Sequence, residues 1–92
     1  MQVRMRYLAQ LKHAAGIGVE AVDVEAPCAV ADLLRRLADR HGDAFRRIVF
    51  DAKGNVQPAL LIFHGDEQAS PDTVRPFQDG DEITVLAPMA GG

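Results

Sequence analysis

The residues best suited to chemistry stand at the C-terminus, which reads Ala87-Pro88-Met89-Ala90-Gly91-Gly92. The last three have almost no side-chain bulk, and glycine adopts a wide range of φ and ψ values. A tail of this kind, from Pro88 to Gly92, can thread the narrow channel of a partner's active site. The alternative is a frayed terminus that happens to be rich in glycine.

The terminal carboxylate of Gly92 is a poor acyl donor until it is activated, for example by adenylation. Once activated, it can accept sulfur and become a thiocarboxylate, or accept an amine and become an amide. We therefore expect Gly92 to be the reacting residue, with Pro88, Met89, Ala90 and Gly91 leading it into a partner enzyme.

Other side chains offer less. Cys28 is the only cysteine, and we expect it near a helix N-terminus, where a thiol pKa is lowered and the group could relay sulfur. A small, inert apolar residue is the favoured interpretation. The three histidines have no companion ligands at metal spacing and no evident catalytic partner. We expect no catalytic side chain, no metal site and no bound cofactor.

Five arginines form a basic cluster between Arg35 and Arg47, with aspartates three or four residues from most of them. Local ion pairing on a solvated helix face explains much of this pattern. A docking surface for an acidic partner is the alternative.

Composition limits the function. The chain has 92 residues, 48% of them hydrophobic and 25% charged, with a formal net charge of −3. This size fits one globular domain, and the negative charge argues against nucleic-acid binding. No apolar run approaches the ~20 residues that span a membrane, and the N-terminus does not resemble a signal peptide. A cytoplasmic protein is expected.

The elements that must position the tail follow from periodicity. Residues 3–8 alternate in polarity and predict a strand, with Val3, Met5 and Tyr7 on one face; residues 19–24 predict a second, forming a hairpin. A helix opens at Pro27 and Cys28 and ends at Gly42. Its apolar stripe recurs at helical spacing in Val30, Leu33, Leu34, Leu37, Ala38 and His41.

Further elements are a short helix over residues 43–50, a strand over 59–63 and a last strand over 82–86. In the loop between these two strands, Ser70-Pro71-Asp72 predicts an irregular connection or a single helical turn, and a short strand is also expected as an alternative. One amphipathic helix against a sheet gives a two-layer α+β fold. The order favours a β-grasp (ubiquitin-like) fold, with a mixed sheet of four to five strands, over a ferredoxin-like fold, which has two strong helices. We expect this domain over residues 1–87 and a flexible tail over 88–92.

The segment from Phe77 through Asp79-Gly80-Asp81-Glu82 to Gly92 resembles the C-terminus of the MoaD/ThiS family of ubiquitin-like sulfur carriers. The opening from Val3 to Gly16 resembles the MoaD type in particular, and the helix ending Asp39-Arg40-His41-Gly42 fits it too. The resemblance covers nearly the whole chain.

The resemblance implies a cytoplasmic carrier without catalysis of its own. An E1-like enzyme would use ATP and magnesium to adenylate Gly92, and a sulfurtransferase or cysteine desulfurase would supply the sulfur. The acceptor would be an enzyme such as the large subunit of molybdopterin synthase. Open alternatives are a carrier for cysteine, homocysteine, thiamine or siderophore biosynthesis, or a protein modifier that forms isopeptides through Gly92. An inert binding module is the third alternative.

The resemblance also implies a docking surface on the exposed face of the sheet. If Val3, Met5 and Tyr7 face the helix, alternation places Leu8 on the other face, and Leu86 joins it if Ile83 and Val85 face the helix. The direction of Leu61 and Phe63 stays open, because their strand is apolar on both faces. We expect Leu8, Phe63 and Leu86 to contact partners, with core packing as the alternative.

Overall fold

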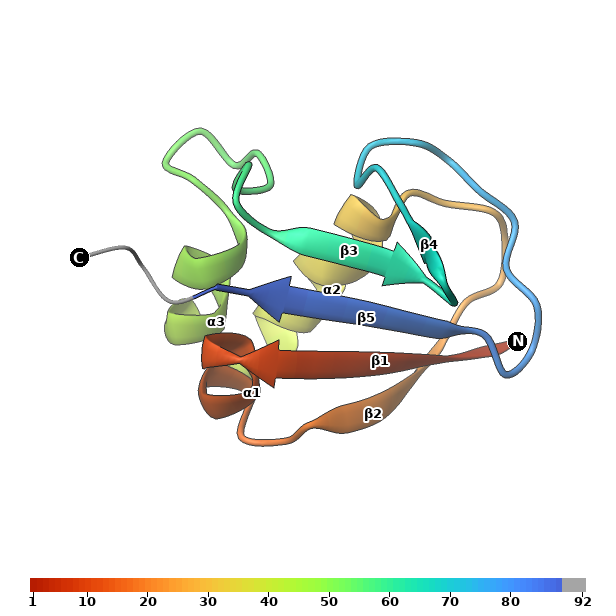
Figure 1. The fold of residues 1–92 in the computed structure, drawn as a ribbon, viewed down its shortest axis with the longest axis horizontal. Helices are drawn as coiled ribbons and strands as arrows, with labels where there is room; N and C mark the ends of the chain where they lie inside the picture. The colour runs from red at the N-terminus through yellow and green to blue at the C-terminus, as the bar shows by residue number, and fades with distance from the viewer. Residues whose placement is uncertain (89–92) are drawn as a thin grey trace.

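A five-stranded mixed sheet forms the front layer of the computed structural model, which describes residues 1–88 (Figure 1). The strand order is β2-β1-β5-β3-β4. β1 (Gln2–Ala9) and β5 (Glu82–Ala87) are parallel neighbours at its centre. β2 (Val19–Asp23) pairs antiparallel with β1, and β3 (Leu61–His64) pairs antiparallel with β5 and with β4 (Glu67–Gln68).

One main helix, α2 (Val30–His41), covers the back of the sheet (Figure 1). It begins at Val30, two to three residues later than the start predicted at Pro27 and Cys28. The backbone N–H of Cys28 donates to the carbonyl of Arg75 at 3.2 Å, and the N–H of Arg75 donates back at 3.1 Å. Because this bridge pairs Cys28 with a distant loop, the helix cannot include it. A single main helix packed on a mixed sheet is the β-grasp arrangement that was predicted.

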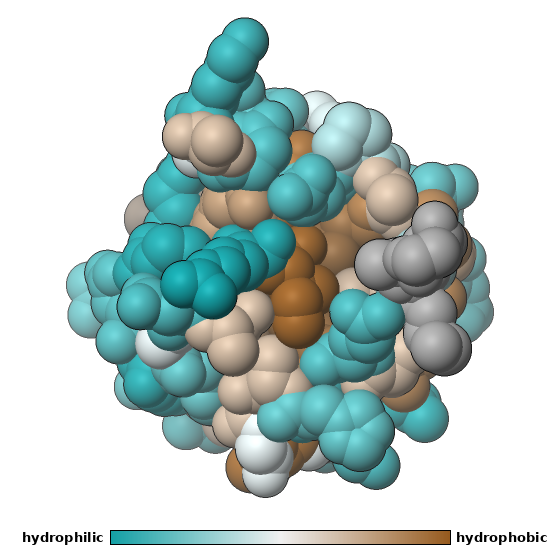
Figure 2. Space-filling model, turned by 90° about the vertical axis from the view of Figure 1, so that its left-hand side faces the viewer, coloured by the Kyte–Doolittle hydropathy of each residue, from teal (hydrophilic) through white to brown (hydrophobic). Residues whose placement is uncertain are grey.

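Two short helices close one end of the molecule. α1 (Gln10–Ala15) follows β1, and α3 (Asp43–Val49) follows α2. Both lie where β1 and β5 end, on the same side of the molecule as the exit of the chain (Figure 1). Figure 2 views the molecule from this end and shows apolar atoms at its centre, surrounded by hydrophilic side chains.

The connection from β1 to α1 has an unusual backbone. Ala9 has φ 58° and ψ −131°, a conformation that glycine adopts far more readily than alanine. It lies beside Ala87, the last residue of β5. The backbone at the end of the central strand pair is therefore strained, at a cost of about 1–3 kcal/mol.

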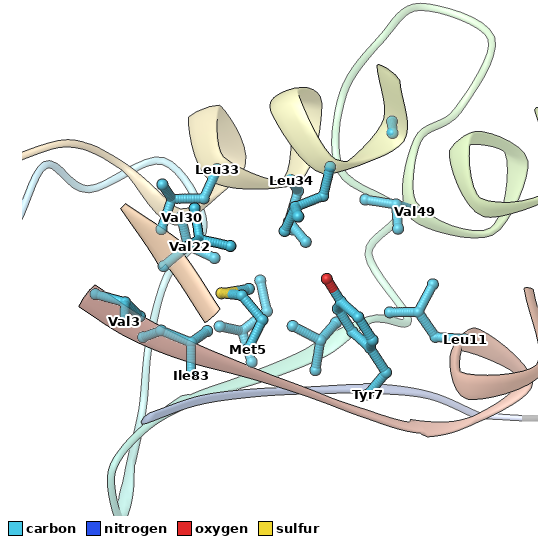
Figure 3. Packing of buried hydrophobic residues seen from close by; sticks show 14 of the residues in the cluster. Val3, Met5, Tyr7, Leu11, Val22, Val30, Leu33, Leu34, Val49 and Ile83 are labelled. Atoms are coloured by element: carbon cyan, nitrogen blue, oxygen red, sulfur yellow. The ribbon is translucent and has the colours of Figure 1, made fainter. Parts of the chain in front are cut away.

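The core lies between the sheet and α2 (Figure 3). Side chains from alternate positions of the central strands point toward the helix and are fully buried: Val3, Met5, Tyr7, Ile83 and Val85. The predicted apolar stripe of α2 meets them, with Leu33, Leu34 and Leu37 each no more than 1% exposed. Burial of these side chains stabilises the fold, by ~25 cal/mol per Å² of apolar surface removed from water.

The remaining elements differ little from the predictions. The short strand between the two last main strands exists as β4, whereas Ser70-Pro71-Asp72 forms a turn and no helical turn. In the described part of the chain, none of the helices is long and apolar enough to cross a membrane.

Candidate functional site

The tail leaves the sheet from its centre. β5 ends at Ala87, and Pro88, which is exposed, comes next. Proline cannot continue the hydrogen-bond ladder, so it marks the end of pairing. β5 has a neighbour on both sides up to Leu86, which pairs with Leu8 of β1 and with Leu61 of β3, and Ala87 still pairs with Ala9 of β1. Of the predicted tail residues, only Pro88 belongs to the described residues; Met89, Ala90, Gly91 and Gly92 lie outside them.

Four half-buried apolar side chains gather on the outer face of the sheet, opposite α2: Leu8, Leu61, Phe63 and Leu86, here called the outer patch. Leu8, Leu86 and Leu61 form one row across three strands. Phe63 lies in the next row, paired with Thr84. The alternation expected for Leu8 and Leu86 is therefore confirmed. In β3, Ile62 is buried toward α2, so Leu61 and Phe63 lie on the outer face. That the outer patch contacts a partner stays a prediction.

The same face becomes charged away from the tail. Arg4 and Arg6 of β1 each lie 3.8 Å from a carboxylate oxygen of Glu82, near the start of β5. These ion pairs are largely exposed, and such pairs contribute little to stability. The outer face thus changes along β1 and β5 from a charged end to an apolar end, and the apolar end is the one from which the tail departs.

A hollow of about 360 Å³ lies at the base of the tail, between α3, the start of β3 and the end of β5. Its lining includes the apolar residues Ile48, Leu60, Ala87 and Pro88 and the polar residues Arg47 and Gln57. We call it the tail-base hollow. It belongs to the end of the molecule seen in Figure 2, where apolar surface is exposed among polar side chains.

A polar cluster that the sequence analysis missed joins three elements behind the sheet. The buried Tyr7 hydroxyl donates to Glu20 Oε2 at 2.6 Å, Arg40 Nη1 donates to Glu20 Oε1 at 2.9 Å, and His41 Nε2 also contacts Glu20. Two signals were present in the sequence: Glu20 shares the inward parity of Val22 in β2, and His41 falls in the apolar stripe of α2.

The charges in this cluster influence one another. Burial alone would raise the pKa of Glu20, but hydrogen bonds from Tyr7, His41 and Arg40 outweigh it and hold that pKa below its usual value. Burial, followed by the hydrogen bond to Glu20, raises the pKa of Tyr7. Hydrogen bonds to the Glu20 carboxylate therefore connect β1, β2 and the end of α2.

Cys28 is half-buried and precedes α2. Burial, and then the negative charge of Asp32, raise the pKa of its thiol. Because sulfur transfer requires a thiolate, this environment is opposite to that of a reactive cysteine and fits the inert interpretation.

His64, the last residue of β3, makes an ordinary pair with an aspartate. Its Nε2 lies 2.8 Å from Asp81 Oδ2, and the backbone N–H of Gln78 donates to the same oxygen. That N–H, followed by the His64 hydrogen bond, lowers the pKa of Asp81. Across residues 1–88, no group of three histidine, cysteine or acidic side chains could hold a metal ion.

Comparisons with known proteins agree with this geometry. The model of the ThiS family matches residues 5–92. A molybdopterin synthase sulfur carrier subunit from Chlamydomonas reinhardtii is 23% identical over 92 residues, which cover 100% of both chains.

Several solved structures resemble the fold, among them the following two. SAMP1 from Haloferax volcanii, a small archaeal modifier protein, is 26% identical, with a TM-score of 0.84 and 100% of each chain covered. A putative molybdopterin converting factor subunit 1 from Pyrococcus furiosus is 24% identical, with a TM-score of 0.72, 97% of this chain covered and 99% of that one; at this identity the likeness shows the fold alone.

Proposed function

Because the chain belongs to the ThiS family, we propose that it is a sulfur carrier that holds sulfur as a thiocarboxylate on Gly92. The observation that carries the proposal is the family match, which extends through Gly91 and Gly92 and thus includes the tail as well as the domain. In this proposal the chain works in the cytoplasm and supplies the acyl group, while its partner enzymes supply the catalytic side chains.

The chemistry begins with activation. The Gly92 carboxylate attacks the α-phosphorus of magnesium-bound ATP in an E1-like enzyme, forming an acyl adenylate and releasing pyrophosphate. A persulfide on a sulfurtransferase or cysteine desulfurase then displaces AMP and forms an acyl disulfide. A second thiol cleaves the S–S bond of that adduct, which leaves a thiocarboxylate on Gly92 and a disulfide between the two thiols.

The arrangement of the domain supports this use of the tail. Pro88 directly follows a strand that is hydrogen-bonded on both sides, so the tail has a rigid origin. A partner that holds the outer patch has a fixed reference from which to receive the tail. Preorganisation of this kind lowers the entropy lost when the reacting group is positioned.

We propose a molybdopterin precursor as the acceptor, bound by the large subunit of molybdopterin synthase. Support comes from the Chlamydomonas relative, whose name is that of the sulfur carrier subunit of this enzyme and which this chain matches over its full length. Carriers for cysteine, homocysteine, thiamine or siderophore biosynthesis share the same tail chemistry, so the acceptor is identified by which precursor gains the sulfur.

The test is the intact mass of the protein purified from its native host without reduction or alkylation. We expect a fraction whose mass exceeds the sequence mass by the difference between sulfur and oxygen, localised to the C-terminal peptide. A variant that lacks Gly91-Gly92 should never show this gain, although its melting temperature should match wild type, because the described core extends no further than Ala87. Wild-type protein that fails to release pyrophosphate with ATP and the host's adenylating enzyme would contradict the proposal.

A second candidate is a protein modifier that forms an isopeptide between Gly92 and a lysine of a target. The likeness to SAMP1 favours it, since that protein is a small archaeal modifier protein. Both functions begin with adenylation, so the products decide between them. Higher-mass conjugates that contain Gly92 joined to lysine would favour the modifier, and their absence beside a detectable thiocarboxylate would favour the carrier.

A further inference from the structure

Charge is distributed unevenly along the chain. The segment from Val30 to Gln57, which contains α2, α3 and the following loop, holds six of the ten basic side chains and four of the thirteen acidic ones. Its formal charge is +2, while the rest of the chain carries −5. An acidic protein thus has a basic region, and uneven charge of this kind steers association with a charged partner.

Three of these six basic side chains line a pocket of about 590 Å³ beside α3, here called the arginine pocket. Its lining includes Arg35 from α2, Arg46 and Arg47 from α3, and Phe50, Gly54 and Gln57 from the loop. Asp51 is the only acidic residue in the lining, and its Oδ1 already accepts hydrogen bonds from the backbone N–H groups of Lys53 and Asn55 at 2.9 and 3.0 Å.

The three arginines are available to a partner. Arg35 pairs with Asp32 at 3.0 Å and Arg46 with Asp39 at 2.6 Å, but these pairs are exposed and exchange at little cost. Arg47 makes no ion pair within the part of the chain that the structure describes. Local pairing, which the sequence favoured for much of the cluster, is made only by Arg35 within residues 1–88, and neither Arg36 nor Arg47 makes an ion pair there.

The arginine pocket adjoins the origin of the tail. Arg47 and Gln57 line both this pocket and the tail-base hollow, whose wall includes Pro88. An enzyme that takes up the tail must approach this end of the molecule, so the pocket lies within its reach.

We infer that the arginine pocket is a second docking contact, which binds an acidic segment of the enzyme that adenylates the tail. The inference rests on the proposed function. A peptide segment fits better than a single small anion, because the guanidinium groups come from two helices and the lining runs on into the apolar tail-base hollow. Arg47, at the junction of the two, contributes most to steering.

The first test measures activation by the host's adenylating enzyme as pyrophosphate release with ATP and magnesium. We expect Arg47→Glu to raise the KM for the carrier about tenfold at low salt and to leave kcat unchanged, because an interfacial charge acts mainly on association. The difference should shrink toward 1 M salt, where the screening length is ~3 Å.

Arg36→Glu is the matched control. It makes the same charge change on α2, but its guanidinium donates to the carbonyl of Asp23 at 3.0 Å and lines neither the arginine pocket nor the tail-base hollow. Its KM should stay within about twofold of wild type. An Arg47→Glu protein that behaves like this control, with wild type still activated, would overturn the inference and leave the proposed function standing.

The second test needs no activity. Isotope-labelled full-length protein is titrated with a short polyglutamate peptide and followed by backbone amide shifts. We expect shifts in α3 and the loop over residues 50–57 that Arg47→Glu abolishes and inorganic phosphate does not reproduce. Equal shifts with phosphate would show a small-anion site and overturn the inference, as would no shift with the peptide. Should wild type release no pyrophosphate, the proposed function fails, and this titration still decides on the pocket.

Discussion

The two faces of the central strands β1 and β5 differ in burial and in polarity. On the inner face, Val3, Met5, Tyr7, Ile83 and Val85 are fully buried against α2. On the outer face, the alternate positions of the same strands stay accessible and change from charged near Glu82 to apolar near Leu86. The inner face therefore specifies the fold, while the outer face can change without cost to the core and is left to specify partners.

The largest expected effect is a loss of stability when a buried side chain on the inner side is truncated. Leu34→Ala in α2 should lower the free energy of unfolding by about 2–5 kcal/mol, because a fully buried leucine leaves a cavity when truncated. Leu61→Ala, which truncates a half-buried leucine of the outer patch, is the control and should cost less than half as much. Urea denaturation of both variants measures the difference. Equal losses would show that the outer patch is part of the core.

The second prediction concerns the outer patch as a docking surface and is measured by how well the adenylating enzyme activates the protein. Leu86→Thr replaces an apolar side chain with one that suits a strand, so folding should hold. We expect the KM for activation to rise about tenfold, because apolar area that the partner would cover is lost.

Val74→Thr makes a similar change at a more exposed apolar residue, 64% accessible, in the loop that leads into the start of β5. It should leave activation as in wild type. If Leu86→Thr and Val74→Thr have the same KM, the outer patch is not a docking surface.

A smaller change in stability is expected from the strained backbone of Ala9, at the end of the sheet where the tail begins. Ala9→Gly should raise the free energy of unfolding by about 1 kcal/mol, because glycine adopts the positive φ of this position without steric cost. Ala14→Gly, in the short helix that follows, should lower it by about the same amount. Thermal unfolding of the pair checks both signs, and a destabilised Ala9→Gly protein would show that the alanine methyl group matters more than the backbone.

The Glu20 carboxylate, which lies among Tyr7, Arg40 and His41 on the α2 side of the sheet, tests the inner face with a charge. Because the folded-state pKa of Glu20 is lowered, its contribution to stability is complete above its usual value of ~4.3 and is lost as the pH falls through the folded-state pKa. Glu20→Gln should therefore be less stable at neutral pH by about 1 kcal/mol, with a weaker loss on acidification. Glu25→Gln, an exposed acidic position, should behave as wild type. An unchanged acid profile in Glu20→Gln would contradict this role.

Periodicity predicted the main helix and the main strands within one or two residues at most boundaries, because each has one buried face. The start of α2 was placed too early, since the bridge between Cys28 and Arg75 joins residues far apart in the sequence. The sequence could not predict which side chains of β3 face α2, because the strand is apolar at every position and shows no alternation. Its register with β5 places Phe63 beside Thr84 on the outer face.

The β-grasp fold, the position of the core and the tail chemistry expected at Gly92 could be predicted from the residues alone, since local periodicity and terminal residue types are properties of the chain. Which side chains meet could be learned only from the folded arrangement of the elements. The row of Leu8, Leu86 and Leu61 depends on strand order, and the cluster around Glu20 joins three elements. The place of Arg47 beside the tail depends on how α3 packs against the end of the sheet, and no pattern within a single element contains that information.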